Sequence, residues 1–214
     1  MRRRGFFGLT VALVTEWLAI SRVAYAAAWE EIGSDEGIRV YRRDVPGSPL
    51  VAFKGTGMVD APLGKIAWVL SDNAHRTNWV DRLKRSVVLE QRSAFDFILY
   101  QHFQLPPLIS DRDYVYRAIG SRNPKTGVVT LQISSVTHPK APPTVGVRAR
   151  LYESRYVLTP KGDRTHVTVE IHTDPKGSLP AWLVNMIQKS WPMNTLQALR
   201  REVKQPYVKS LELP

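Results

Sequence analysis

The hydrophobic residues of this 214-residue chain follow a period of two over most of its length and a helical period near its end. Between residues 38 and 173, short runs rich in β-branched and aromatic residues alternate with polar residues and are separated by turn residues. Such runs predict antiparallel strands in sequential hairpins. We expect about eight strands: Ile38–Arg43, Leu50–Val59, Val87–Gln91, Ala94–Gln104, Asp113–Ile119, Val128–Val136, Gly146–Leu158 and Thr165–Thr173.

Two short helices are predicted between the second and third strands. The sequence Asp60-Ala61-Pro62 is a helix-start signal, and the apolar residues after it recur at helical spacing. The polar stretch 72–80 predicts a second short helix. Arg76 and Trp79 share one face of it because they are three residues apart.

The segment 174–204 carries the strongest helix signal in the chain. We expect Ser178 as its N-cap and a kink near Trp191, because Pro192 removes a backbone donor. A one-sided apolar pattern of this kind fits an ordinary core helix, and it also fits a helix that closes a ligand cavity. Its apolar positions are Leu179, Trp182, Leu183, Met186, Ile187, Met193, Leu196, Leu199 and Val203.

The order of these elements predicts the fold class. Strands joined mostly by hairpins and followed by one long helix are typical of an α+β domain with an antiparallel sheet. We expect the sheet to curve around the terminal helix, with either a packed core or a cavity between them.

The N-terminus has the pattern of a secretory signal peptide. Three arginines, Arg2 to Arg4, precede the apolar run Phe6–Val14, and Ala24-Tyr25-Ala26 forms a small-residue cleavage site. The apolar run is too short and too polar to span a membrane well. We therefore divide the chain into a signal peptide at residues 1–26 and one domain at residues 27–214, and we expect an exported protein of a bacterial periplasm. The chain contains no cysteine, which excludes disulfides and thiol chemistry.

The chain is basic, with a formal net charge of +11 from 30 basic and 19 acidic residues. Residues 1–26 hold four arginines and one glutamate, so the remainder keeps 26 basic and 18 acidic residues, or +8. These charges are dispersed and show no nucleic-acid-binding motif, so no nucleic acid partner is expected. They suit transient contact with an anionic membrane surface, or they simply keep the protein soluble.

The sequence lacks the common catalytic and metal-binding motifs. It has no G-x-S-x-G, no H-E-x-x-H and no complete phosphate loop, and its five histidines show no metal spacing. We therefore expect no metal and no cofactor. His166, Glu170 and His172 share one strand face, as an acid–base group or as polar residues facing solvent.

Three motifs carry a resemblance to a known family. They are Arg76–Trp79 (RTNW), Ser110–Tyr116 (SDRDYVY) and Asp174–Asn185 (DPKGSLPAWLVN). From Trp29 to about Lys204 the chain resembles the START (StAR-related lipid-transfer) domains, and among them the phosphatidylcholine-transfer branch. The resemblance implies a helix-grip fold in which the sheet and the terminal helix enclose one lipid. It also implies a non-enzymatic role in binding and transferring that lipid.

The resemblance also implies particular site residues. The arginine that pairs with the lipid phosphate in that branch matches Arg76, and aromatic residues around the choline match Tyr114 and Tyr152. A tryptophan of the choline cage is Gln101 here, which weakens a choline specificity because quaternary ammonium groups are held by ring faces. Arg76 equally suits a surface salt bridge, and both tyrosines equally suit a core.

The gate of the family is expected at the terminal helix, where Leu183 and Met186 are our cavity candidates, and at the proline-rich loop 137–145. We expect a monomer that holds a phospholipid or another membrane lipid such as a sterol. Two alternatives stay open. One is a polyketide cyclase or aromatase of the same wider superfamily, which would need polar groups for proton transfer along its cavity. The other is a membrane-docking module with a filled core.

Overall fold

A computed structural model describes residues 28–213 of the chain. The predicted signal peptide, residues 1–26, lies outside the described residues. Within them the chain forms ten strands and four helices. The strands are β1 (Glu30–Asp35), β2 (Ile38–Arg43), β3 (Ala52–Val59), β4 (Leu83–Ser93), β5 (Asp96–Phe103), β6 (Arg112–Arg122), β7 (Val129–Ser135), β8 (Val147–Arg148), β9 (Arg150–Lys161) and β10 (Arg164–Asp174). The helices are α1 (Leu63–Ser71), α2 (Arg76–Trp79), α3 (Ala181–Gln188) and α4 (Trp191–Glu202).

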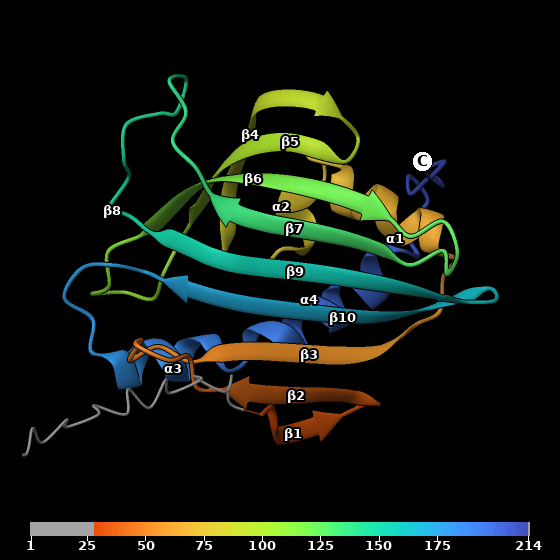
Figure 1. Cartoon of the computed structure of the whole chain (residues 1–214). Helices are drawn as coiled ribbons and strands as arrows, with labels where there is room; N and C mark the ends of the chain where they lie inside the picture. The colour runs from red at the N-terminus through yellow and green to blue at the C-terminus, as the bar shows by residue number, and fades with distance from the viewer. Residues whose placement is uncertain (1–27, 214) are drawn as a thin grey trace, which may run out of the picture.

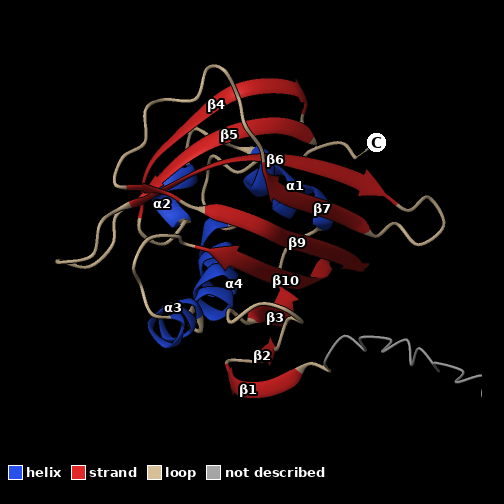
Figure 2. Cartoon of the chain, turned by 60° about the vertical axis from the view of Figure 1, so that its left-hand side comes forward, coloured by secondary structure: helices blue, strands red, loops and turns tan. Residues whose placement is uncertain are grey.

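One curved sheet forms the frame of the molecule (Figure 1). Its strand order is β1-β2-β3-β10-β9-β7-β6-β5-β4, and β8 pairs with β6 outside this path. Neighbours along the path are antiparallel, whereas β8 is parallel to β6. All four helices lie on the same face of the sheet (Figure 2). The predicted α+β helix-grip fold is confirmed.

The sheet grips α4 through a close approach at β3. A Cβ atom on Gly55 would lie 2.7 Å from Cβ of Pro192 and 3.2 Å from Cδ1 of Leu196. Because Gly55 has no side chain, the helix α4 can pack directly against the backbone of β3. The helix then buries Leu196 and Leu199 completely, in the same core cluster as Val167 of β10.

The residues after α4 return to the two short helices. The ring of Tyr207 stacks on His75 with centroids 3.9 Å apart, and its hydroxyl donates to Oε1 of Glu202 (2.7 Å). Further along, the amide of Leu211 donates to the carbonyl of Gly64 (3.0 Å). This C-terminal segment, residues 203–213, thus holds α1 and α2 against the end of α4.

Four details of the sequence-based prediction change. The predicted strand Gly146–Leu158 is two strands, β8 and β9. The strand β1 was not expected. The predicted terminal helix is two helices, α3 and α4, separated by Lys189 and Ser190, so the expected kink near Trp191 is a break. The first of them begins at Ala181 with Pro180 as its N-cap, so the prediction of Ser178 as N-cap was wrong. No helix within residues 28–213 combines the length and the apolar content that crossing a membrane requires.

We expect Gly55→Ala to destabilise the domain by about 1–3 kcal/mol, because the added methyl group would overlap Pro192 and force α4 away from β3. Thermal or urea unfolding measures the change. Gly33→Ala in β1 is the matched control, since a Cβ there meets no atom within 4 Å. Equal stability of the two variants would contradict this account of the helix crossing.

Candidate functional site

A cavity of about 210 Å³ lies between the inner face of the sheet and the helices α2, α3 and α4. By this measure a single water needs about 10–15 Å³, so the space is far larger than a packing defect. Its walls are mostly apolar, and a few polar side chains enter it. The apolar lining includes Phe97, Phe103, Leu131, Ile133, Leu151, Ile171, Val184 and Ile187.

Strand alternation explains which side chains of β6 face the cavity. Tyr114, Tyr116 and Ala118 line the cavity because successive side chains of a strand point to opposite faces. The residues between them, including Asp113 and Val115, therefore point to the outer face of the sheet.

Arg76 is the central polar group of the cavity. It is buried, with 7% of its surface exposed, at the first position of α2. Its Nη2 donates to the backbone carbonyl of Leu70, and its Nε is buried without any hydrogen-bond partner. No described carboxylate forms an ion pair with it; the nearby Asp81 pairs with Arg82 instead. Arg76 is thus a buried charge without a described counter-ion, an arrangement that costs several kcal/mol.

The hydroxyls around Arg76 can act as further donors. Burial raises the pKa of Tyr116 above its ordinary value, and the hydrogen bond and charge of Arg76 offset this only in part. Burial likewise raises the pKa of Tyr156, which also lines the cavity. Both phenols therefore stay protonated at neutral pH. Together with the guanidinium they form a donor-rich pocket, which suits an anion.

Two other predicted site residues also line the cavity. Gln101 is buried, and its Nε2 donates to Oγ of Ser86 (3.2 Å), which in turn donates to Oδ1 of Asn73 (2.6 Å). Tyr114 is paired with Gln101 in the β5–β6 register, and its hydroxyl is hydrogen-bonded to Oγ1 of Thr173 (3.3 Å). The structure thus brings Arg76, Gln101 and Tyr114 to one cavity.

Tyr152 does not line the cavity, contrary to the expected cavity position. Simple alternation along β9 would place it on the same face as Ser154 and Tyr156, which do line it. A β-bulge opposite His172 and Thr173 shifts the phase, so Leu151 points inward. The ring of Tyr152 stacks on His172 instead, with centroids 4.9 Å apart, in a groove outside the cavity.

Leu183 and Met186 also lie outside the cavity lining. The inward face of α3 consists of Val184, Ile187 and Gln188, at helical spacing. Met186 is 58% exposed, and the neighbouring Trp182 is 67% exposed. Because α3 is apolar on both its inner and outer faces, the helical spacing of its apolar residues did not show which face lines the cavity.

The proline-rich loop 137–145, one of the two expected gate positions, contributes no residue to the cavity lining. Asp113, which is completely buried on the outer face of the sheet, holds this loop in place. The carboxylate accepts from the amide of Val145 (2.8 Å) and pairs with Arg148, whose Nη2 also donates to the carbonyl of Pro142 (2.9 Å).

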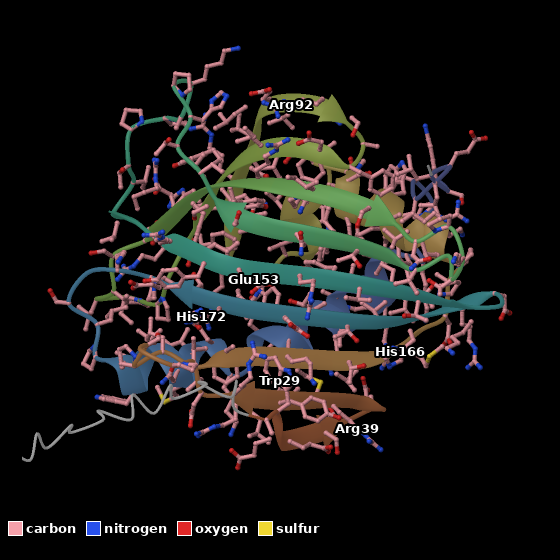
Figure 3. The ribbon with its side chains drawn as sticks, viewed as in Figure 1. Trp29, Arg39, Arg92, Glu153, His166 and His172 are labelled. Carbon is pink, nitrogen blue, oxygen red and sulfur yellow. The ribbon has the colours of Figure 1, made fainter. Side chains whose placement is uncertain are left out.

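The polar outer face of the sheet does not form an acid–base group. Glu170 pairs with Arg155 (2.8 Å), His166 is hydrogen-bonded to Thr56 (2.8 Å), and His172 stacks on Tyr152. His166 and His172 lie on the face away from the helices (Figure 3). Among residues 28–213, no group of three or more histidine, aspartate or glutamate side chains could hold a metal ion.

Comparison with known proteins identifies the family. A family model described as START domain matches residues 22–207. The chain belongs to the START domain family. A START-type relative of known structure, a STAR-related lipid transfer protein from Xanthomonas axonopodis, is 30% identical with a TM-score of 0.76, and the match covers 83% of this chain and 99% of that chain.

Two curated relatives extend this comparison. The phosphatidylcholine transfer protein of Bos taurus is 29% identical over 178 residues, which cover 80% of this START domain chain and 82% of the relative. An uncharacterized protein of Pseudomonas aeruginosa is 29% identical over 204 residues, which cover 92% of this chain and 96% of the relative. The predicted family resemblance is confirmed.

Several polar residues of the cavity were missed in the sequence, among them Tyr116, Tyr156 and Gln188. Tyr116 lies two residues after Tyr114, so strand alternation could have identified it. Tyr156 lies four residues after the predicted Tyr152, so simple alternation along the strand could have identified it. Gln188 gives no such signal, because its position in the cavity depends on which face of α3 turns inward.

We expect Arg76→Met to stabilise the delipidated domain by about 1 kcal/mol. The buried guanidinium has an unsatisfied donor, and the substitution puts an apolar side chain in its place. Thermal unfolding of the delipidated protein measures the change. The control is Arg39→Met, which changes an exposed arginine of β2. A clear loss of stability in Arg76→Met alone would show that Arg76 supports the fold rather than a ligand.

Proposed function

We propose that this START domain binds one phospholipid in its cavity and carries it between membranes without catalysing a reaction. The observation that supports this most directly is the buried guanidinium of Arg76, which has an unpaired donor inside an apolar cavity. A phosphate supplies both the charge and the acceptor that Arg76 lacks. A neutral sterol would leave the charge unpaired, so we favour a phospholipid over a sterol.

The apolar walls supply the affinity for the hydrocarbon part of such a ligand. Removing an acyl chain of roughly 16 carbons from water is worth on the order of 12 kcal/mol, at about 0.8 kcal/mol per methylene. Phe97, Leu131 and Val184 are among the residues that would surround it. A cavity of this kind also argues against a docking module with a filled core.

We further propose that the headgroup is not selected as choline. The amide of Gln101 stands where the phosphatidylcholine-transfer branch has a tryptophan, and it is engaged with Ser86. Tyr152, the second expected cage residue, stacks on His172 outside the cavity. Of the three cage positions only Tyr114 presents a ring to the cavity, and one ring holds a quaternary ammonium weakly.

Membrane contact would take place at the end of the molecule that carries α3. Trp182 and Met186 expose large apolar side chains on this helix, and Leu108 is fully exposed in the β5–β6 loop. Arg112 links the two segments, because its guanidinium donates to the carbonyls of Pro175 (2.6 Å) and Lys176 (3.1 Å) just before α3. These exposed residues, together with the net charge of +8 after residue 26, suit insertion into an anionic membrane surface. We place this activity in a bacterial periplasm and expect a monomer.

Native mass spectrometry of the domain purified from a lipid-containing host tests the proposed function. We expect a one-to-one adduct that releases a phospholipid, and we expect Arg76→Met to reduce its occupancy about tenfold or more, since the phosphate loses its charged partner. Arg39→Met is again the control. A domain that carries no lipid after purification, and that also extracts none from phospholipid vesicles, would contradict the proposal.

The proposed membrane contact gives a separate prediction. We expect Trp182→Ser combined with Met186→Ser to slow lipid transfer between anionic vesicles several-fold, because the exposed apolar face of α3 no longer enters the bilayer. A fluorescent phospholipid reports the transfer rate. Val88→Ser, which removes an exposed apolar residue from β4, is the matched control. An unchanged rate in the double variant would exclude α3 as the docking element.

A further inference from the structure

The cavity contains a second buried polar atom without a partner. Oε1 of Gln188, in the last turn of α3, is buried and accepts no hydrogen bond. It lies in the lining of the same cavity as Nε of Arg76, which is an unpaired donor. The cavity thus offers one unpaired donor and one unpaired acceptor, and a phosphate alone can satisfy only the donor.

The orientation of the Gln188 amide follows from its neighbour. Its Nε2 donates to the backbone carbonyl of Thr173 at 3.4 Å. A carbonyl can only accept, so the nitrogen must face Thr173 and the oxygen must face away from it. The free position is therefore an acceptor, and its ligand partner must be a donor.

The charges around the cavity favour a neutral donor. The charged residues in its lining are Arg76, Asp81, Arg82 and Arg112. The single acidic one, Asp81, is half exposed and already accepts from Nδ2 of Asn194 (3.2 Å). An ammonium group would enter a site with an excess of positive charge, whereas a hydroxyl donates without a charge. A hydroxyl is thus the better partner for Gln188.

A series of contacts relates Gln188 and Arg76 to neighbouring inward positions of β6. Gln188 binds the carbonyl of Thr173, whose hydroxyl pairs with Tyr114, and Arg76 contacts Tyr116. The two tyrosines are two residues apart on the inner face of β6, which corresponds to about 7 Å along the strand. Gln188 and Arg76 thus reach the cavity beside adjacent inward residues of one strand, where a headgroup with a hydroxyl a few bonds from its phosphate would meet both.

We propose that Gln188 is a specificity-determining residue that accepts a hydrogen bond from a headgroup hydroxyl, so that the domain prefers hydroxyl-bearing anionic phospholipids. This inference rests on the proposed function, since it requires the phosphate to lie at Arg76. It assigns Gln188 a role in recognition in addition to its bond to Thr173.

Two phospholipids of equal charge test the inference. Phosphatidylglycerol and phosphatidylpropanol with identical acyl chains differ only in the headgroup hydroxyls. The domain is equilibrated with vesicles that contain both in equal amounts in phosphatidylcholine, and native mass spectrometry measures the ratio of the two bound lipids. We expect a preference of about five- to tenfold for phosphatidylglycerol, the factor of one hydrogen bond.

The variant Gln188→Met should lower this ratio to about one, because methionine keeps the length of the side chain and removes the acceptor. Gln132→Met, at an exposed position of β7, should keep the wild-type ratio. Gln188→Leu serves as a second variant if the first does not fold.

The possible outcomes separate the two proposals. Equal binding of both lipids by the wild type, or an undiminished preference in Gln188→Met, would overturn the role of Gln188 while the proposed function stands. Uptake of phosphatidylcholine alone would likewise overturn only the role of Gln188. If the wild type takes up no phospholipid from these vesicles, the proposed function fails, and the role of Gln188 fails with it.

Discussion

The structure depends on one constraint: α4 must pack directly against the backbone of β3, with no side chain between them. Gly55 permits this approach, and Pro192 and Leu196 occupy the space that a side chain would need. With α4 fixed against β3, between β2 and β10 in the curved sheet, the helix does not fill the space between α2, α3 and the strands from β5 to β10. The same contact that closes the core therefore leaves a cavity beside it. The position of α4 on β3 thus accounts both for the tight packing beside this helix and for the cavity next to it.

The cavity combines an apolar wall with a small set of polar atoms whose requirements the protein itself does not meet. Most buried polar groups in a folded protein are paired. Among the described residues, Arg76, Arg155 and Gln188 retain an unpaired buried atom, and the first and last of them line the cavity. A domain that keeps such groups gives up stability in its empty state, and the lost stability returns when a ligand with complementary groups binds. This pattern is typical of a binding site rather than of a packing fault.

Much of the fold could be predicted from the sequence, because period-two and helical patterns are local properties. The parts that failed depend on contacts between distant residues. The strand β1 was not predicted because its residues are mostly exposed on both faces. Its sequence therefore shows no alternation of apolar and polar residues. Tyr152 was misplaced because a bulge depends on the pairing of β9 with β10. Arg76, Gln101 and Tyr114 were placed correctly in the cavity, since family motifs and an unbroken alternation identify them. The face of α3 could not be predicted, because apolar residues surround this helix.

The stacking of Tyr207 on His75 has a consequence for the order in which the molecule assembles. The helix α2 is only four residues long, too short to be stable by itself, and it carries Arg76. Its packing partner Tyr207 follows it in the sequence after the whole of the sheet from β4 onward and both later helices. The end of the cavity that carries Arg76 therefore depends on the last segment of the chain. During synthesis this end can be completed only after the sheet and both later helices have been made.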